Sequence, residues 1–353
     1  MESKKIQQGR RKKCSNKYIG IELTEEIEIV GGINAGSFGD IYLGRNKTTM
    51  EEFAVKFDKN KTKRSLENFD KEYRILKRIE GRGRFPYCSL VKFWPEDEKE
   101  PISAMVMEKL GPNIYDMFKL CDKRFSDATG CWLMIDLLKR MKEFHACGII
   151  HRDIKPENFC LGGRNLDKIY LIDFGLSKNY IDSNGEHIPF SKNRGFVGTR
   201  RYAGKYAHKG YLQSRRDDLE ALGYLVVFLM KGGLPWQDVK MDDLSKKEKH
   251  RKLYQIKKAM SIRRLCQGLP KPFEFYLREI RKLNYEETPE YDKLIKLFYE
   301  YSKENDFKRE FDWEEDPEFL KEYKGWKKYQ KRVRDAARFY KKSNLDEEST
   351  KDY

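Results

Sequence analysis

The residues best suited to chemistry in this chain form one short polar run, His151-Arg152-Asp153-Ile154-Lys155-Pro156-Glu157-Asn158, with Asp173-Phe174-Gly175 further along. Transfer of a phosphoryl group needs a carboxylate for the incoming hydroxyl, a cation for developing negative charge and oxygen ligands for Mg²⁺. We predict Asp153 as the base and Lys155 as the cation. Asn158 and Asp173 are the predicted ligands of Mg²⁺. Each residue alone fits an ordinary polar loop, but the order and spacing of the set indicate phosphoryl transfer.

A turn that contains glycine, between Asn34 and Ile41, is predicted to cover the phosphates of a nucleotide. Glycine has no Cβ, so the backbone N–H groups of such a turn can approach phosphates closely. Asn34 stands where comparable turns have their first glycine. Because asparagine tolerates left-handed backbone better than most residues, we expect the hairpin to survive with an altered grip on the nucleotide.

Two charged residues are predicted to complete the nucleotide site. Lys56 would contact the α- and β-phosphates of ATP, and Glu72 on the following helix would pair with Lys56. We choose Glu72 because it lies on the apolar face of that helix, four residues before Leu76; the alternative is an ordinary surface charge. Glu108 and Leu110 are expected to offer backbone groups to adenine. The residues predicted to contact ATP are Ile33, Ala35, Gly36, Ser37, Gly39, Ile41, Ala54, Lys56, Met107, Glu108, Leu110, Asn158, Leu161 and Asp173.

Hydrophobic periodicity predicts a small β-rich part followed by a larger helical part. The first part contains a strand, turn and strand over Glu28–Leu43, a strand over Glu52–Phe57, a helix over Ser65–Ile79 and a strand over Ala104–Met107. Gly111-Pro112 marks the predicted linker between the two parts. In the second part we predict an amphipathic helix over Asp127–Cys147, short strands around Phe159–Leu161 and Ile169–Ile172, a buried helix over Leu222–Met230, and helices up to Phe311.

The chain has a net charge of +16, and much of it lies at the two ends. Residues 1–20 carry seven Lys and Arg against one Glu, and Lys321–Lys342 carries ten against two acidic residues. Such ends could bind nucleic acid, an acidic membrane or a phosphorylated protein, although we favour solvated tails over nucleic-acid or membrane contact. Arg10-Arg11-Lys12-Lys13 resembles a nuclear import signal.

The remaining composition indicates a protein that stays inside the cell. Its seven cysteines are scattered without a Cys-x-x-Cys pair, which is typical of reduced thiols. The first residues contain no apolar run, so we expect no secretory signal. A cytoplasmic or nuclear location follows as a prediction.

Several motifs together resemble the casein kinase 1 family of Ser/Thr protein kinases, over roughly residues 24–313. One motif is the polar run His151–Asn158, which corresponds to the catalytic loop of that family. The other stretches that carry the resemblance are Gly36–Gly44, Leu110–Pro112, His187–Phe190, Gly198–Ala203, Gln213–Glu220, Leu234–Gln237 and Phe311–Trp313. The resemblance implies an α+β bilobal kinase fold, with an N-lobe over 24–108, a C-lobe over 109–313, an N-terminal extension over 1–23 and a C-terminal tail over 314–353. It also implies ATP-dependent phosphorylation of Ser or Thr in acidic or already phosphorylated substrates, and we expect a monomer.

The segment that would face the peptide substrate agrees with such a preference. Leu176–Tyr206 contains six Lys and Arg against two acidic residues, and arginine pairs bidentately with phosphate and carboxylate groups. Arg201 matches a position that binds anions in the family, and Lys252 is a second candidate whose register is ambiguous. A solvated basic face is the alternative. Gly204 and Tyr206 stand where the family usually has Ser and Asn, so substrate preference could differ.

A catalytically weak pseudokinase or scaffold, which binds nucleotide and partners without phosphoryl transfer, is the competing hypothesis. Its only support is Asn34. Retention of Lys56, Asp153, Asn158 and Asp173 favours an active enzyme.

Overall fold

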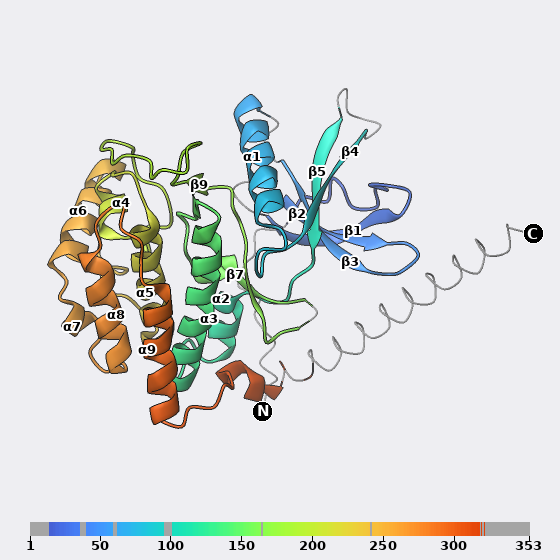
Figure 1. The fold of residues 1–353 in the computed structure, drawn as a ribbon. Coiled ribbons are helices and arrows are strands. Elements are labelled where there is room, and N and C mark those ends of the chain that lie inside the picture. The colour runs from blue at the N-terminus through green and yellow to red at the C-terminus, as the bar shows by residue number, and fades with distance from the viewer. Residues whose placement is uncertain are drawn as a thin grey trace, which may run out of the picture.

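The chain folds into two lobes with different secondary structure, a sheet with one helix and a larger helical body, as Figure 1 shows. The computed structural model describes residues 14–35, 40–58, 62–94, 101–163, 165–240, 242–317, 319 and 321. The predicted bilobal α+β kinase fold is confirmed by this architecture.

The smaller lobe contains a five-stranded antiparallel sheet with strand order β1-β2-β3-β5-β4. Its strands are β1 (Ile27–Ala35), β2 (Asp40–Asn46), β3 (Glu52–Phe57), β4 (Cys88–Phe93) and β5 (Ile102–Glu108). Strand β4 was not predicted, because its sequence alternates weakly; only its end residues, Cys88 and Phe93, are buried, and the four residues between them are exposed or half-buried.

Strand register divides the side chains of the sheet between two faces. Tyr42, Val55 and Val106 lie opposite one another across β2, β3 and β5, and they belong to a hydrophobic cluster that also includes Tyr18. Because side chains alternate along a strand, Ala54 and Lys56 lie on the other face.

Helix α1 (Lys63–Ile79) is the helix of the smaller lobe, and in Figure 1 it lies beside β4 and β5. It begins at a capping box in which the Thr62 hydroxyl accepts from the Ser65 N–H. Phe69, Leu76 and Ile79 are buried on one face. Glu72 is buried on this face too, which fixes its direction before any ligand binds.

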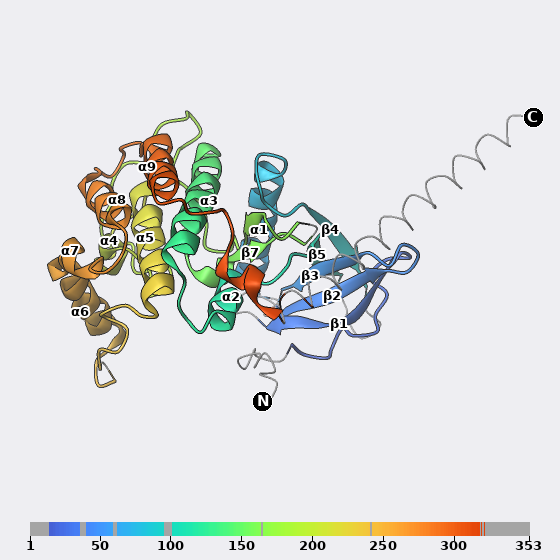
Figure 2. The ribbon, with the colours of Figure 1, turned by 90° about the horizontal axis from the view of Figure 1, so that it is seen from below.

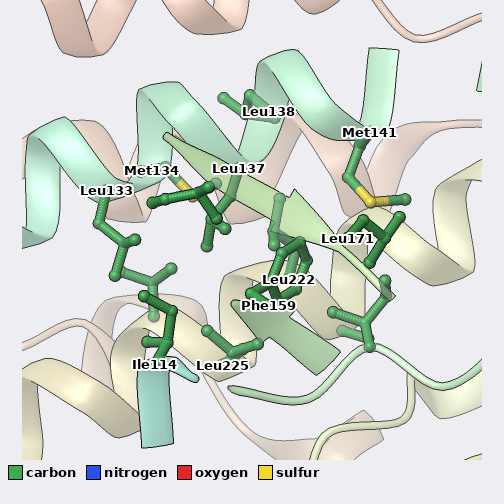
Figure 3. Packing of buried hydrophobic residues seen from close by; sticks show 14 of the residues in the cluster. Ile114, Leu133, Met134, Leu137, Leu138, Met141, Phe159, Leu171, Leu222 and Leu225 are labelled. Carbon is green, nitrogen blue, oxygen red and sulfur yellow. The ribbon is translucent and has the colours of Figure 1, made fainter. Parts of the chain in front are cut away.

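The helical lobe is built around α3 (Asp127–Ala146) and α5 (Arg215–Lys231). Leu133, Leu137 and Met141 of α3 pack near Leu222 and Leu225 of α5, as Figure 3 shows. The expectation of an amphipathic helix over Asp127–Cys147 was wrong in one respect: α3 is buried on most of its circumference, including Asp136, Arg140 and His145. Neighbours pack on several sides of it, among them α5 and α9 (Tyr291–Glu304).

The other elements of this lobe surround the two central helices (Figures 1 and 2). They are α2 (Ile114–Leu120), β6 (Ile149–Ile150), η1 (Pro156–Asn158), β7 (Phe159–Leu161), β8 (Ile169–Leu171), β9 (Lys178–Asn179), α4 (Lys205–His208), α6 (Lys246–Ala259), α7 (Ile262–Leu265), α8 (Lys271–Lys282) and η2 (Asp312–Glu315). Helix α2 was not predicted. Among the described residues, none of the helices is long and apolar enough to cross a membrane.

Candidate active site

A buried ion pair joins the sheet to α1. Lys56 Nζ lies 2.7 Å from both carboxylate oxygens of Glu72. Burial alone would lower the pKa of Lys56, but Glu72 and Asp173 outweigh it and raise that pKa. Lys56 therefore carries a fixed positive charge that faces Asp173 across the interface between the lobes.

The carboxylate of Asp153, the predicted base, accepts hydrogen bonds from two side chains. Lys155 Nζ donates to Asp153 Oδ2 at 2.5 Å, and Thr199 Oγ1 donates to Asp153 Oδ1 at 2.7 Å. Lys155 Nζ is also 4.0 Å from Asp173 Oδ2. Asp153 and Asp173 thus share one cationic neighbour, and the predicted base and metal ligand lie in the same site.

Two residues of this site have left-handed backbone conformations. Arg152 has φ 68° and Asp173 has φ 64°, which non-glycine residues adopt only when their surroundings hold them there. Arg152 Nε donates to the Leu176 carbonyl at 2.7 Å. Phe174, next to Asp173, is buried and stacks on Phe144 with ring centroids 5.3 Å apart. The buried ring anchors the segment and leaves the Asp173 carboxylate partly exposed.

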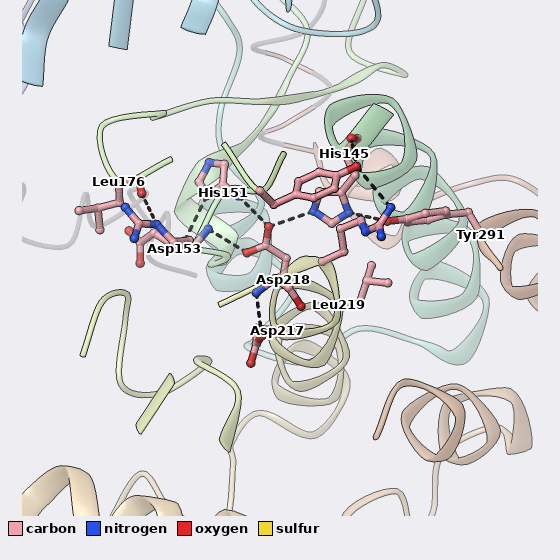
Figure 4. A network of polar contacts seen from close by, with 12 residues as sticks. His145, His151, Asp153, Leu176, Asp217, Asp218, Leu219 and Tyr291 are labelled. Atoms are coloured by element: carbon pink, nitrogen blue, oxygen red, sulfur yellow. Dashed lines mark hydrogen bonds and ion pairs between the residues drawn. The ribbon is translucent and has the colours of Figure 1, made fainter. Parts of the chain in front are cut away.

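Asp218 supports the catalytic loop from beneath, as Figure 4 shows. Its two carboxylate oxygens accept hydrogen bonds from the N–H groups of His151 at 2.7 Å and Arg152 at 2.8 Å. His145 Nε2 lies 3.0 Å from the same carboxylate, and its Nδ1 lies 2.6 Å from the Tyr291 hydroxyl. Burial would raise the pKa of Asp218, but the His145 hydrogen bond and the charges and N–H groups around it lower that pKa. The loop therefore rests on an ionised carboxylate.

The two predicted magnesium ligands have the right chemistry for that ion. Asn158 Nδ2 donates to the Asp153 carbonyl at 2.9 Å, which directs the amide nitrogen into the protein and leaves the amide oxygen as an acceptor. Asp173 adds a carboxylate. One amide and one carboxylate oxygen, completed by phosphate oxygens and water, suit Mg²⁺. Asn158 and Asp173 would hold the ion.

Strand pairing brings several of the predicted nucleotide contacts together. Ile41 lies opposite Lys56, and Ala54 lies opposite Met107, so all four side chains are on the same face of the sheet. Leu161 lies below the linker between the lobes, because its N–H donates to the Pro112 carbonyl and its carbonyl accepts from Gly111. Glu108 N–H donates to the Tyr87 carbonyl, and Leu110 is half-buried in the linker.

The glycine turn can be followed only in part. Ile33 and Ala35 lie at the end of β1, where Asn34 pairs with Ile41 and Ala35 with Asp40, just after a register shift between Gly32 and Asn34. Gly36, Ser37 and Gly39 lie outside the described residues. The role of this turn over the phosphates stays a prediction.

The two predicted anion-binding residues have different surroundings. The Arg201 guanidinium lies over the Phe228 ring, 5.1 Å from its centroid, and is half-buried. Burial would lower the pKa of Arg201, but Tyr202 above all, then Tyr115 and Glu157 of the catalytic loop, raise that pKa. Lys252 Nζ instead donates to the Lys240 carbonyl at 3.2 Å. Arg201 therefore borders the catalytic loop, whereas the hydrogen bond of Lys252 joins α6 to the loop before it.

Two residues of the site were missed by sequence reasoning. Thr199 follows Gly198 in one of the motifs that resemble the casein kinase 1 family, and its hydroxyl was the available signal. Lys257 is fully buried on α6 beneath the loop that carries Arg201. Its position on the buried face with His250 and Leu253 was the available signal.

A family model for the protein kinase domain matches residues 26–306. The matched range contains the Lys56–Glu72 pair, the catalytic loop and Asp173, which the fold brings to one site between the lobes. The predicted kinase fold and this match agree, and the chain belongs to the protein kinase family.

Proposed function

We propose that this protein is a serine/threonine kinase of the casein kinase 1 type that uses Mg²⁺ and ATP to phosphorylate acidic or already phosphorylated proteins. One observation supports phosphoryl transfer most strongly: the two carboxylate oxygens of Asp153 accept hydrogen bonds from Thr199 and Lys155. Asp153 is thus oriented, next to a cation, with lone pairs left for an incoming hydroxyl.

The proposed reaction assigns one task to each residue. Asp153 accepts the proton of the substrate hydroxyl while the hydroxyl oxygen bonds to the γ-phosphorus of ATP. The bond between the γ-phosphorus and the β–γ bridging oxygen breaks, which releases ADP. Lys155 neutralises charge on the phosphoryl oxygens, and Lys56, held by Glu72, orients the α- and β-phosphates. Mg²⁺, when bound at Asn158 and Asp173, would offset the negative charge of the phosphates.

The contacts of Glu220, a residue of one of the casein kinase 1 motifs, support the casein kinase 1 assignment. Most kinases have Ala-Pro-Glu at the end of the activation segment, whereas this chain has Ala203-Gly204-Lys205. Here the Lys205 N–H donates to Glu220 Oε2 at 3.0 Å. Arg281 Nε donates to the other oxygen of Glu220 at 3.1 Å. Glu220, from the Ser-Arg-Arg-Asp-Asp-Leu-Glu run, therefore anchors the segment in place of the missing glutamate.

A cluster of like charges supports the preference for anionic substrates. Burial and the guanidinium groups of Arg152 and Arg194 lower the pKa of Lys178. The pKa of Lys71 is also lowered, by burial and by the positive charges of Arg152 and Lys178. A phosphate or carboxylate group between these cations would relieve their repulsion.

A peptide comparison tests the proposal. Serine peptides that are phosphorylated upstream, acidic or neutral are compared by kcat/KM for the wild type and the Arg201→Ala variant. We expect the wild type to favour the phosphorylated and acidic peptides, and Arg201→Ala to reduce the preference for phosphate. Equal use of all three peptides by the wild type would overturn the substrate assignment.

A monomer in the cytoplasm or nucleus is what we propose. Binding of the basic ends to nucleic acid or to anionic membranes is open to a direct test, in which chains with and without residues 1–20 and 314–353 are compared for binding to DNA and to anionic vesicles.

A further inference from the structure

A lysine that is fully buried in the helical lobe lies directly beneath the loop that carries Arg201. Lys257 Nζ donates to the carbonyl oxygens of Arg200 at 2.9 Å, Arg201 at 3.2 Å and Ala203 at 2.7 Å. A buried ammonium is costly unless it is hydrogen-bonded. Three carbonyl groups from one short loop provide those bonds, so the loop and the lysine hold each other in place.

Other contacts fix Lys257 in its position. The ammonium lies 4.8 Å from the centroid of the Trp236 ring, and the backbone carbonyl of Lys257 accepts from Arg281 at 2.9 Å. Trp236 also donates its indole N–H to the Arg201 carbonyl at 2.7 Å. The Arg201 carbonyl thus has two donors from beneath, which turns the backbone of this residue inward.

The loop held by Lys257 is joined to the catalytic carboxylate at one end and to α5 at the other. Thr199, which donates to Asp153 Oδ1, also accepts the N–H groups of Tyr202 and Ala203 on its carbonyl. Lys205 N–H donates to Glu220. Both ends are therefore fixed by other residues, and Lys257 fixes the middle, where Arg201 is.

We propose that Lys257 is a positioning residue, which acts through the backbone of Arg200–Ala203 to direct the Arg201 guanidinium toward the anionic group of the substrate. This inference rests on the proposed preference for anionic substrates. It assigns no contact between Lys257 and the substrate, because Lys257 is buried beneath the loop.

Steady-state kinetics of Lys257→Met test the inference. Methionine has a similar length but no donors, so the loop should lose its central anchor. We expect KM for a phosphorylated peptide to rise about tenfold, with a much smaller change in KM for a neutral peptide and for ATP. Lys258→Met, at the exposed neighbouring position on α6, is the matched control and should behave as the wild type.

A double-mutant cycle shows whether Lys257 acts through Arg201. If it does, Lys257→Met should add little to the KM increase that Arg201→Ala already causes, because the arginine is no longer there to be directed. Additive effects in the cycle would overturn the inference. So would an unchanged KM for the phosphorylated peptide in a folded Lys257→Met variant.

Trp236→Phe is a second variant that tests the same inference if Lys257→Met does not fold. This change keeps an aromatic six-membered ring, and with the rest of the indole it removes the N–H that donates to the Arg201 carbonyl. We expect a smaller KM increase with the same selectivity for the phosphorylated peptide, and equal KM changes for both peptides would contradict the inference. A wild type without preference for anionic peptides would instead refute the proposed substrate class.

The pH dependence of KM gives a further readout that needs no substitution. Burial lowers the pKa of Lys257 to about 7, opposed by Glu220 and assisted by Arg281. Two other titratable groups contact Lys257, His208 at 3.1 Å and the Tyr224 ring at 5.4 Å from its centroid, and His250 lies 3.4 Å from His208. Burial lowers the pKa values of both histidines and raises the pKa of Tyr224. None of these three gains charge above neutral pH, so loss of the Lys257 ammonium should raise KM for the phosphorylated peptide as pH rises above about 7. A flat profile between pH 7 and about 9 would contradict the inference.

Discussion

At the scale of single residues, the site depends on hydrogen bonds that orient a few charged groups. Asp153 has both carboxylate oxygens engaged, and Asp218 has both engaged as well. The difference lies in the donors, since Asp153 accepts from side chains near the surface and Asp218 accepts from buried backbone groups. Asp153 is thus available to a substrate, whereas Asp218 is committed to support.

Thr199 offers a test of orientation at this scale. In Thr199→Val the hydroxyl that donates to Asp153 Oδ1 is lost while the side-chain shape is kept. We expect kcat to fall about tenfold, because a misdirected base transfers the proton less efficiently. Thr199→Ser, which restores the hydroxyl, is the matched control and should recover most of the activity. Equal kcat values for the valine and serine variants would contradict this role.

At the scale of elements, the N-terminus of α5 supports the catalytic loop. Asp217 and Asp218 are adjacent and buried, yet burial raises the pKa of Asp217 to about 7, whereas hydrogen bonds lower the pKa of Asp218. Asp217 accepts one bond, from the Ser214 N–H at 2.9 Å. The number of donors around each carboxylate accounts for the opposite directions.

Substitution of these two carboxylates by amides should therefore have unequal effects. Asp218→Asn keeps one of two acceptor oxygens and loses the charge, so we expect a loss of about 3 kcal/mol in the free energy of unfolding. Asp217→Asn keeps an acceptor for Ser214 and should cost much less. Denaturant titrations at pH 7 compare the two variants, and equal losses would refute the assigned role of Asp218.

The effect of Asp218 has a defined pH window. Its folded pKa lies below the ordinary value of 3.8, so its stabilising effect is present above about pH 4 and is lost as the pH falls through the lower folded pKa. The stability difference between the wild type and Asp218→Asn should be constant from pH 6 to about 8 and shrink below about pH 4. A difference that grew on acidification would contradict this account.

The sequence predicted elements well where the pattern was strong and poorly where tertiary contacts decide. Glu52–Phe57 was predicted with its observed limits, and Asp127–Cys147 differs from α3 by one residue. The predicted amphipathic character of α3 was wrong, because Asp136 and His145 are polar by type yet buried with partners in distant segments, Arg309 and Asp218. Periodicity counts residue types and cannot detect a polar side chain whose partner lies far along the chain.

In the site, too, residues in a local pattern were predicted and residues that depend on tertiary contacts were missed. Spacing alone predicted Asp153, Lys155 and Asp173 as site residues, and the structure places Lys155 next to both carboxylates. Lys257 could not be assigned in this way, because its role depends on carbonyl groups more than fifty residues earlier in the chain. The choice of Lys252 as an anion ligand came from a register that the sequence leaves ambiguous.

At the scale of the whole molecule, the charge of +16 should affect how substrates approach. Steering by many exposed charges acts over long distances and is screened by salt, whereas the chemistry inside the site is screened less. We expect kcat/KM for an acidic peptide to fall about tenfold between 50 and about 300 mM NaCl, with little change in kcat.

A neutral serine peptide is the control for this prediction. Its kcat/KM should change little over the same range of salt. Equal salt dependence for both peptides would show that salt acts on the enzyme itself, and it would contradict long-range attraction of anionic substrates.

The central claim is that one carboxylate, Asp153, with magnesium ligands at Asn158 and Asp173, transfers the terminal phosphate of ATP to a protein hydroxyl. Transfer of radiolabelled phosphate from ATP to an acidic protein, measured for the wild type and Asp153→Asn together with ATP binding by both, tests this claim most directly. We predict transfer by the wild type, a loss of at least about hundredfold in the variant, and ATP binding by both. Two equally inert proteins that still bind ATP would contradict the claim and favour a scaffold that binds nucleotide without catalysis.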